Sequence, residues 1–154
     1  NRIELSAHDV GFILGYRTAL AKKMLAVSDA MYGGAKNVLS SECFNHFFLM
    51  IDWAFANGYR RMEWKCNALN APSRRAAQRL GYSFEGVFRQ HSVVKGRNRD
   101  TAWFAITDQD WPHLRPAYEA WLSPSNFDAQ GMQRNSLATL TAPHLFQTDP
   151  TLKA

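Results

Sequence analysis

The sequence is poor in cysteine, and its two thiols, Cys43 and Cys66, exclude two classes of small protein. Two cysteines are too few for the disulfide framework of a small secreted domain and too few for a cysteine-ligated zinc site. We therefore expect both thiols to be reduced and buried, one on a helix and one on a strand. This cysteine usage predicts a cytoplasmic protein without a metal cofactor.

Long apolar runs are absent as well. No run approaches the roughly 20 residues that a membrane-spanning helix needs, and no signal peptide is visible. Internal repeats and low-complexity blocks are also missing. The sequence therefore predicts neither a membrane protein nor a repeat protein. Its length of 154 residues suits one domain with a core of its own.

Acidic residues are scarce in the middle of the chain, where most of the positive charge gathers. Ten basic residues lie between Arg60 and Arg99, and only Glu63, Glu85 and Asp100 oppose them. Such a cluster can contact the phosphates of a nucleotide cofactor or of a nucleic acid. A solvated helix face and hairpin loop is the plainer interpretation, and it is favoured for each single residue. A nucleic-acid-binding module is the least favoured hypothesis, because no recognised nucleic-acid motif accompanies the charges.

The same central stretch predicts a series of alternating elements. Residues 61–66 alternate between apolar and polar side chains, as a strand does. Residues 67–72 hold two Asn and one Pro, which are turn residues, and residues 73–80 are rich in the helix formers Ala and Arg. Gly81 is placed to end that helix. Two further strands follow, joined by a basic loop at residues 95–99.

Two helices are predicted before this stretch. Residues 16–31 carry one apolar face and a polar remainder, which is typical of an amphipathic packing helix. Residues 41–56 are apolar over much of their circumference, so we expect that helix to be buried against a sheet.

After the central stretch the pattern predicts one more helix and then a tail. Asp108 is a good N-cap for a helix over residues 109–122, in which Pro116 predicts a kink or a late start. From residue 123 the chain turns polar and contains several prolines. We therefore expect residues 1–122 to form the domain and residues 123–154 to form an extended or partly disordered tail.

Several short motifs of the central stretch occur in a fixed order. They are Glu63-Trp64-Lys65-Cys66-Asn67, Asn70-Ala71-Pro72-Ser73, Arg79-Leu80-Gly81-Tyr82, Phe84-Glu85-Gly86, Lys95-Gly96-Arg97-Asn98-Arg99-Asp100-Thr101 and Trp103-Phe104. As a set they resemble the GNAT superfamily of N-acetyltransferases, in the branch of the ribosomal-protein alanine N-acetyltransferases (the RimJ/RimL type). The resemblance is close over residues 40–111. It implies an α/β fold, in which helices pack on a mixed sheet, and acetyl transfer from acetyl-CoA to a primary amine by direct attack.

The resemblance extends weakly to the start of the chain. Arg2-Ile3-Glu4-Leu5-Ser6 is similar to the family's central strand before the cofactor loop, and the alternative is a frayed terminus with no such strand. If the match holds, the chain starts in mid-domain and the fold is incomplete at its N-terminus. A first residue Asn1 in place of Met fits a fragment or a trimmed chain. Half a domain exposes a sheet edge and apolar surface, which favours a homodimer or strand exchange between copies.

The family's pyrophosphate loop is altered in this sequence. In the family, glycine-rich backbone N–H groups and the next helix N-terminus hold the pyrophosphate of coenzyme A. At residues 35–42 bulkier residues replace the glycines, which puts tight binding in doubt because glycine permits close backbone approach. Lys36 can compensate in part by charge, and Ser40 is a good N-cap. The cofactor-binding residues that the resemblance implies are Lys36, Asn37, Ser40, Ser41, Lys65, Cys66, Asn70, Ser73 and Arg79.

Asn70 and Ser73 match the family's Asn-x-x-Ser motif. The resemblance implies that Asn70 bonds the pantetheine arm and that the Ser73 hydroxyl donates to the leaving thiolate. Many members place a tyrosine at the position of Ala77, and its absence leaves Ser73 as the best proton donor. Glu4 is the implied general base, and Glu63 is a second candidate. The simpler interpretation is that Asn70 caps the turn and Ser73 caps the helix.

Two functions remain open on the sequence alone. The first is an acetyl-CoA-dependent N-acetyltransferase whose acceptor is a protein N-terminus, a small amine or an antibiotic. The alternative is a catalytically inactive GNAT-like remnant that serves as a CoA-binding or protein-interaction module. The altered loop, the missing N-terminal half and the absent tyrosine favour the remnant, whereas the ordered motifs favour the enzyme.

Overall fold

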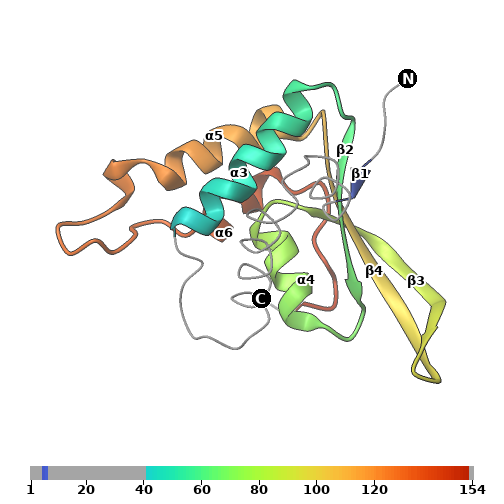
Figure 1. Cartoon of the computed structure of the whole chain (residues 1–154). Coiled ribbons are helices and arrows are strands. Elements are labelled where there is room, and N and C mark those ends of the chain that lie inside the picture. The colour runs from blue at the N-terminus through green and yellow to red at the C-terminus, as the bar shows by residue number, and fades with distance from the viewer. Residues whose placement is uncertain (1–4, 7–40, 153–154) are drawn as a thin grey trace. The chain divides into compact units, whose positions relative to one another are not determined.

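A computed structural model describes residues 5–6 and 41–152 of the chain, with side chains from residue 47 onward. The chain divides into two compact units, Asn1–Met62 and Glu63–Ala154. Figure 1 shows the elements in chain order by colour. The helix predicted over residues 16–31 and the pyrophosphate loop up to residue 40 lie outside the described residues.

The first unit contributes one long helix to the described part of the chain. α3 spans Ser41–Ala56, the bounds that the apolar pattern predicts. Phe47, Ile51 and Ala54 are buried at spacings of four and three, so they form one face of the helix. On another face of the helix, Leu49 is 61% exposed.

Two short features flank this helix. The short strand β1 covers Leu5–Ser6, the end of the strand predicted from residue 2. After α3 the Tyr59 N–H donates to the Ala54 carbonyl at 3.1 Å, and Gly58 has a φ of 81°. A positive φ is easily reached by glycine, so the helix ends at the Asn57-Gly58 pair.

Three strands of one sheet run through the second unit. β2 (Arg61–Asn67), β4 (Arg97–Thr107) and β3 (Ser83–Val94) neighbour one another in that order (Figure 1). Along β2, Trp64 and Cys66 are buried while Lys65 between them is exposed. This alternation is that of a strand with one buried face, and it confirms the strand predicted over residues 61–66.

The hairpin of β3 and β4 is closed by Lys95 and Gly96 alone. Their φ angles are 51° and 73°, and Val94 pairs directly with Arg97. Two successive positive φ angles are those of a type I′ turn, which matches the twist of the strands. The basic loop predicted over residues 95–99 is therefore wrong in length, because Arg97 and its two successors already belong to β4.

α4 (Ala71–Arg79) follows β2 after a tight turn and packs against β3 and β4. The Gly81 N–H donates to the Gln78 carbonyl at 2.9 Å, and the Tyr82 N–H donates to the Ala77 carbonyl at 3.0 Å. With Gly81 at a φ of 85°, these bonds form a Schellman motif. The prediction that Gly81 ends this helix is confirmed.

α5 (Trp111–Leu122) begins two residues later than predicted, and its N-cap is Asp110 rather than Asp108. The Asp110 carboxylate accepts bonds from the N–H and the hydroxyl of Thr107, at 2.8 and 2.7 Å. These bonds close a turn at the end of β4, and the turn delays the helix. Pro116 lies inside α5 without ending it.

The C-terminal segment is folded over much of its length. Its helical turns are η1 (Pro124–Asn126), α6 (Leu137–Thr141) and η2 (Ala142–His144). α6 packs against α4 and α5, and its Leu137 is buried. The Thr141 hydroxyl also bonds the Arg79 carbonyl at 3.0 Å. The expectation of an extended or partly disordered tail over residues 123–154 is thus corrected. The segment has few apolar residues, and hydrogen bonds to the rest of the unit hold it in place.

Aromatic side chains dominate the interior of the second unit. Tyr82, Phe104 and Tyr118 are fully buried, and the Tyr118 hydroxyl donates to the Leu80 carbonyl at 2.7 Å. The Tyr82 hydroxyl is buried without a hydrogen-bond partner among the described residues. None of the helices in the described ranges is long and apolar enough to cross a membrane.

Candidate active site

Trp64, Cys66 and Ser73 form a buried cluster where β2 meets α4. The indole Nε1 of Trp64 donates to the Ser73 Oγ at 3.1 Å, and Ser73 is only 1% exposed. Ser73 also forms a hydrogen bond with the Cys66 thiol. The Ser73 hydroxyl therefore links the strand to the helix and lies in contact with a sulfur atom.

The Cys66 thiol is kept neutral by its surroundings. Burial raises its pKa, and the hydrogen bond with Ser73 and the charge of Arg74 oppose this shift only in part. Since the thiolate is the nucleophilic form, a buried thiol with a raised pKa is a poor nucleophile. The site thus supports a mechanism in which no cysteine attacks the substrate.

Asn70 organises the turn that leads into α4. Its side-chain Oδ1 accepts the N–H of Ser73 at 3.2 Å, which makes it the N-cap of the helix. The Asn70 N–H in turn donates to the carbonyl of Asn67 at 2.8 Å. The simpler interpretation is confirmed for Asn70 and wrong for Ser73, whose hydroxyl is bonded to Trp64 instead of capping the helix.

A buried ion pair lies next to this turn. The Arg74 Nε and Nη2 donate to the two carboxylate oxygens of Asp149, at 2.6 and 2.8 Å. The side chains of Arg74 and Asp149 are 9% and 0% exposed. The third nitrogen of the guanidinium, Nη1, donates to the Ala68 carbonyl at 2.8 Å. These hydrogen bonds compensate the buried charges of both the guanidinium and the carboxylate.

No family model and no curated protein matches the sequence. Among solved structures, a GCN5-related N-acetyltransferase from Brucella melitensis is 50% identical over 71% of this chain, with a TM-score of 0.64. A probable acetyltransferase of the GNAT family from Chromobacterium violaceum is 52% identical over 43% of this chain and 36% of its own, with a TM-score of 0.41. A sequence identity of 50% over 71% of this chain, together with the shared fold of the Brucella melitensis protein, is sufficient to assign the family. The chain belongs to the GNAT family.

The predicted α/β fold of GNAT type is therefore confirmed. The chain spans about half the length of the Brucella melitensis protein, since the match covers 50% of that chain.

The structure brings together three of the site residues that the GNAT resemblance implies. Cys66, Asn70 and Ser73 meet at the junction of β2 and α4. Lys65 lies on the opposite face of β2, where its Nζ is 5.1 Å from the centroid of the Trp103 ring. Arg79 is exposed at the end of α4. These two residues do not join the cluster.

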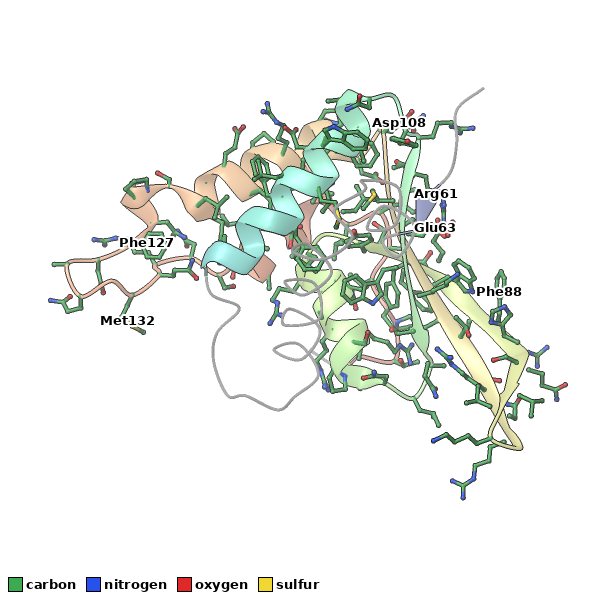
Figure 2. The ribbon with its side chains drawn as sticks, viewed as in Figure 1. Arg61, Glu63, Phe88, Asp108, Phe127 and Met132 are labelled. Atoms are coloured by element: carbon green, nitrogen blue, oxygen red, sulfur yellow. The ribbon has the colours of Figure 1, made fainter. Side chains whose placement is uncertain are left out.

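The remaining predicted residues give less information. Glu4, Lys36, Asn37 and Ser40 lie outside the described residues. Ser41 is the first residue of α3, and the structure describes its backbone only. Glu63, the second candidate for the base, is partly buried on β2 (Figure 2).

The hairpin tip is an exposed surface of mixed character. Lys95 and Arg97 are exposed, as is Phe88, which is 56% exposed on β3 (Figure 2). Phe88 contacts Trp103 with ring centroids 5.2 Å apart. The exposure of the cations agrees with the plainer interpretation of a solvated hairpin.

Two residues of the site had no signal in the sequence. Arg74 looks like one more cation on an Ala- and Arg-rich helix, and Asp149 lies in a segment expected to be a tail. Only the folded chain brings them together, 75 residues apart. Among the described residues there is no group of three or more His, Cys, Asp or Glu side chains that could hold a metal ion.

Proposed function

We propose that this protein is an N-acetyltransferase that transfers the acetyl group of acetyl-CoA to a primary amine. The observation that carries the proposal is the arrangement of Asn70 and Ser73 at the start of α4. The helix cap uses Oδ1 of Asn70. The Nδ2 group of the same side chain remains a donor that suits the carbonyl oxygens of a pantetheine arm. The Ser73 hydroxyl is already bonded to a sulfur, so donation to a second sulfur requires only an exchange of partners.

The chemistry of this proposal is direct attack. The amine nitrogen forms a bond with the thioester carbonyl carbon, and the carbon–sulfur bond breaks as the tetrahedral adduct collapses. The amine proton passes to a base, for which Glu4 is the first candidate and Glu63 the second. Ser73 donates a hydrogen bond or a proton to the departing thiolate, and the Trp64 indole holds the Ser73 oxygen in place.

The further assignments rest on the resemblance. We assign the chain to the RimJ/RimL type, with a protein N-terminus or a small amine as acceptor, a cytoplasmic location and a homodimeric state. No metal ion takes part in the proposed reaction. Besides Asn70 and Ser73, we assign seven further residues as contacts of acetyl-CoA: Lys36, Asn37, Ser40, Ser41, Lys65, Cys66 and Arg79.

A titration with acetyl-CoA tests the cofactor site. We expect micromolar binding to the wild-type chain and about fivefold weaker binding to Asn70→Ala, because one net hydrogen bond is worth about 1 kcal/mol. Asn98→Ala is the matched control, since Asn98 bonds Asp100 on the exposed hairpin. Equal affinity of the Asn70→Ala variant would remove Asn70 from the site.

A kinetic measurement tests the role of Ser73. We expect Ser73→Ala to lower kcat by about 10²-fold, the lower end for a lost general acid, because a thiolate is already a fair leaving group. The KM for acetyl-CoA should change little. Ser125→Ala, on the exposed η1 turn, is the control. An unchanged kcat would leave Ser73 with a structural role, through its bonds to Trp64 and Cys66.

The remnant hypothesis is the second candidate, and the altered pyrophosphate loop favours it. It predicts weak or absent cofactor binding and no release of free coenzyme A with any amine. Thioester turnover by the wild-type chain with a single amine acceptor contradicts it.

A further inference from the structure

We propose that the C-terminal segment, residues 145–151, positions the cofactor-binding turn, residues 67–70, through the guanidinium of Arg74. The inference rests on the proposed function, because it assigns Arg74 and Asp149 as positioning residues for the acetyl-CoA site. Neither residue needs to touch the cofactor. Figure 1 shows the segment, coloured red, passing α4.

The segment is itself attached to the sheet. The Phe146 N–H donates to the Ser83 hydroxyl at 2.8 Å, and the Phe84 N–H donates to the Gln147 carbonyl at 2.9 Å. These two bonds hold the segment against the start of β3. A segment fixed at this point can carry a side chain to a defined position.

Asp149 is held in one orientation by its own neighbours. Its Oδ1 accepts the N–H and the hydroxyl of Thr151, at 3.0 and 2.9 Å. The same carboxylate receives two donors of Arg74 and is fully buried. An acceptor with this many fixed donors has little freedom to turn, so it sets the position of the guanidinium.

Arg74 transmits this position to the turn by two routes. Its Nη1 donates to the Ala68 carbonyl at 2.8 Å, and its backbone N–H donates to the Asn70 carbonyl at 3.1 Å. The Ala68 N–H bonds the Asp100 carbonyl of β4 at 2.9 Å, which fixes the other side of the turn. Arg74 therefore completes a closed set of bonds around Asn70, the residue proposed to hold the pantetheine arm.

A purely structural ion pair would have a different consequence. It would stabilise the whole chain and leave the affinity of the folded protein for acetyl-CoA unchanged. Lysine at position 74 separates the two roles. Its single ammonium can pair with Asp149, but it lacks the planar fork that bonds Ala68 at the same time.

The experiment compares Arg74→Lys with the wild-type chain and with Arg115→Lys, an exposed partner of Glu119 on α5. Hydrogen exchange of the ligand-free proteins is measured first, and acetyl-CoA is then titrated into each. We expect at least about tenfold faster exchange at the amides of residues 68–71, 73 and 74 in Arg74→Lys alone, and about tenfold weaker acetyl-CoA binding. The second figure corresponds to about 1.4 kcal/mol of lost binding free energy.

The outcomes separate this inference from the proposed function. Unchanged exchange in the turn, or unchanged affinity of a folded Arg74→Lys protein, overturns the inference alone. A wild-type chain that binds no acetyl-CoA overturns the proposed function, and with it the cofactor part of the inference. If Arg74→Lys fails to fold, Asp149→Glu replaces it, because this variant keeps both charges and shifts only the position of the carboxylate. Faster exchange and weaker binding in either variant support the inference.

Discussion

Asp149→Asn is expected to lower the free energy of unfolding by about 3–5 kcal/mol, because it leaves the buried Arg74 charge without a counter-ion. Asparagine has nearly the same shape as aspartate, so the change removes charge without opening a cavity. Urea denaturation, monitored by tryptophan fluorescence, measures the loss of unfolding free energy. An effect of this size is a large part of the 5–15 kcal/mol that stabilises most domains.

The Arg115–Glu119 pair provides the matched comparison. Its atoms are 3.5 Å apart on exposed positions of α5, one turn from each other. Exposed pairs of this kind contribute about 0.3–0.5 kcal/mol, so Glu119→Gln should hardly change the urea midpoint. If the two variants lose equal stability, the Arg74–Asp149 pair is not buried as the structure has it.

Gly81→Ala is expected to cost about 2–5 kcal/mol of unfolding free energy, for two separate reasons. A left-handed φ, here 85°, costs a residue with a Cβ about 1–2 kcal/mol. The new methyl group would also lie 2.6 Å from the Leu114 Cδ2, and such overpacking costs about 1–3 kcal/mol more. Thermal and urea denaturation of the variant measure the total.

Gly96 separates the two contributions. Its φ is 73°, but no atom lies within 4 Å of an added Cβ. Gly96→Ala should therefore show the conformational cost alone. Leu114→Ala in the Gly81→Ala background should recover part of the overpacking, so the double variant should be more stable than the sum of the single changes predicts. Additive losses in this cycle would show that the contact with Leu114 has no effect.

The two largest effects concern positions on opposite ends of α4. Gly81 ends the helix and sets the direction of β3, whereas the Arg74–Asp149 pair fixes the turn before it. Both changes are expected to destabilise the chain, so each variant must be shown to be folded before its acetyl-CoA affinity is compared with that of the wild-type chain. Circular dichroism at the assay temperature is sufficient for that control.

Much of this protein was determined by local sequence alone. The bounds of α3, the strand β2 and the end of α4 at Gly81 follow from apolar spacing and from a glycine at a helix end. These features depend on neighbours a few residues away, which a sequence displays directly. The ordered motifs of the central stretch were also sufficient to predict the GNAT fold.

Element boundaries were predicted wrongly by a few residues where two local signals compete. Asp108 and Asp110 are equally good caps, and the bonds between Asp110 and Thr107 decide which of them begins α5. The loop of the hairpin is shorter than predicted, because strand pairing continues to Val94 and Arg97 and leaves a turn of two residues.

Only the tertiary structure decided how the C-terminal segment folds and which residues surround the candidate site. Thirteen acidic residues were available to the buried Arg74, and no spacing rule selects one that is 75 positions away. Likewise the burial of Ser73 beneath Trp64 depends on the packing of a helix against a strand. Periodicity and capping encode local backbone preference, whereas pairings of this kind exist only after packing has excluded water and fixed both partners.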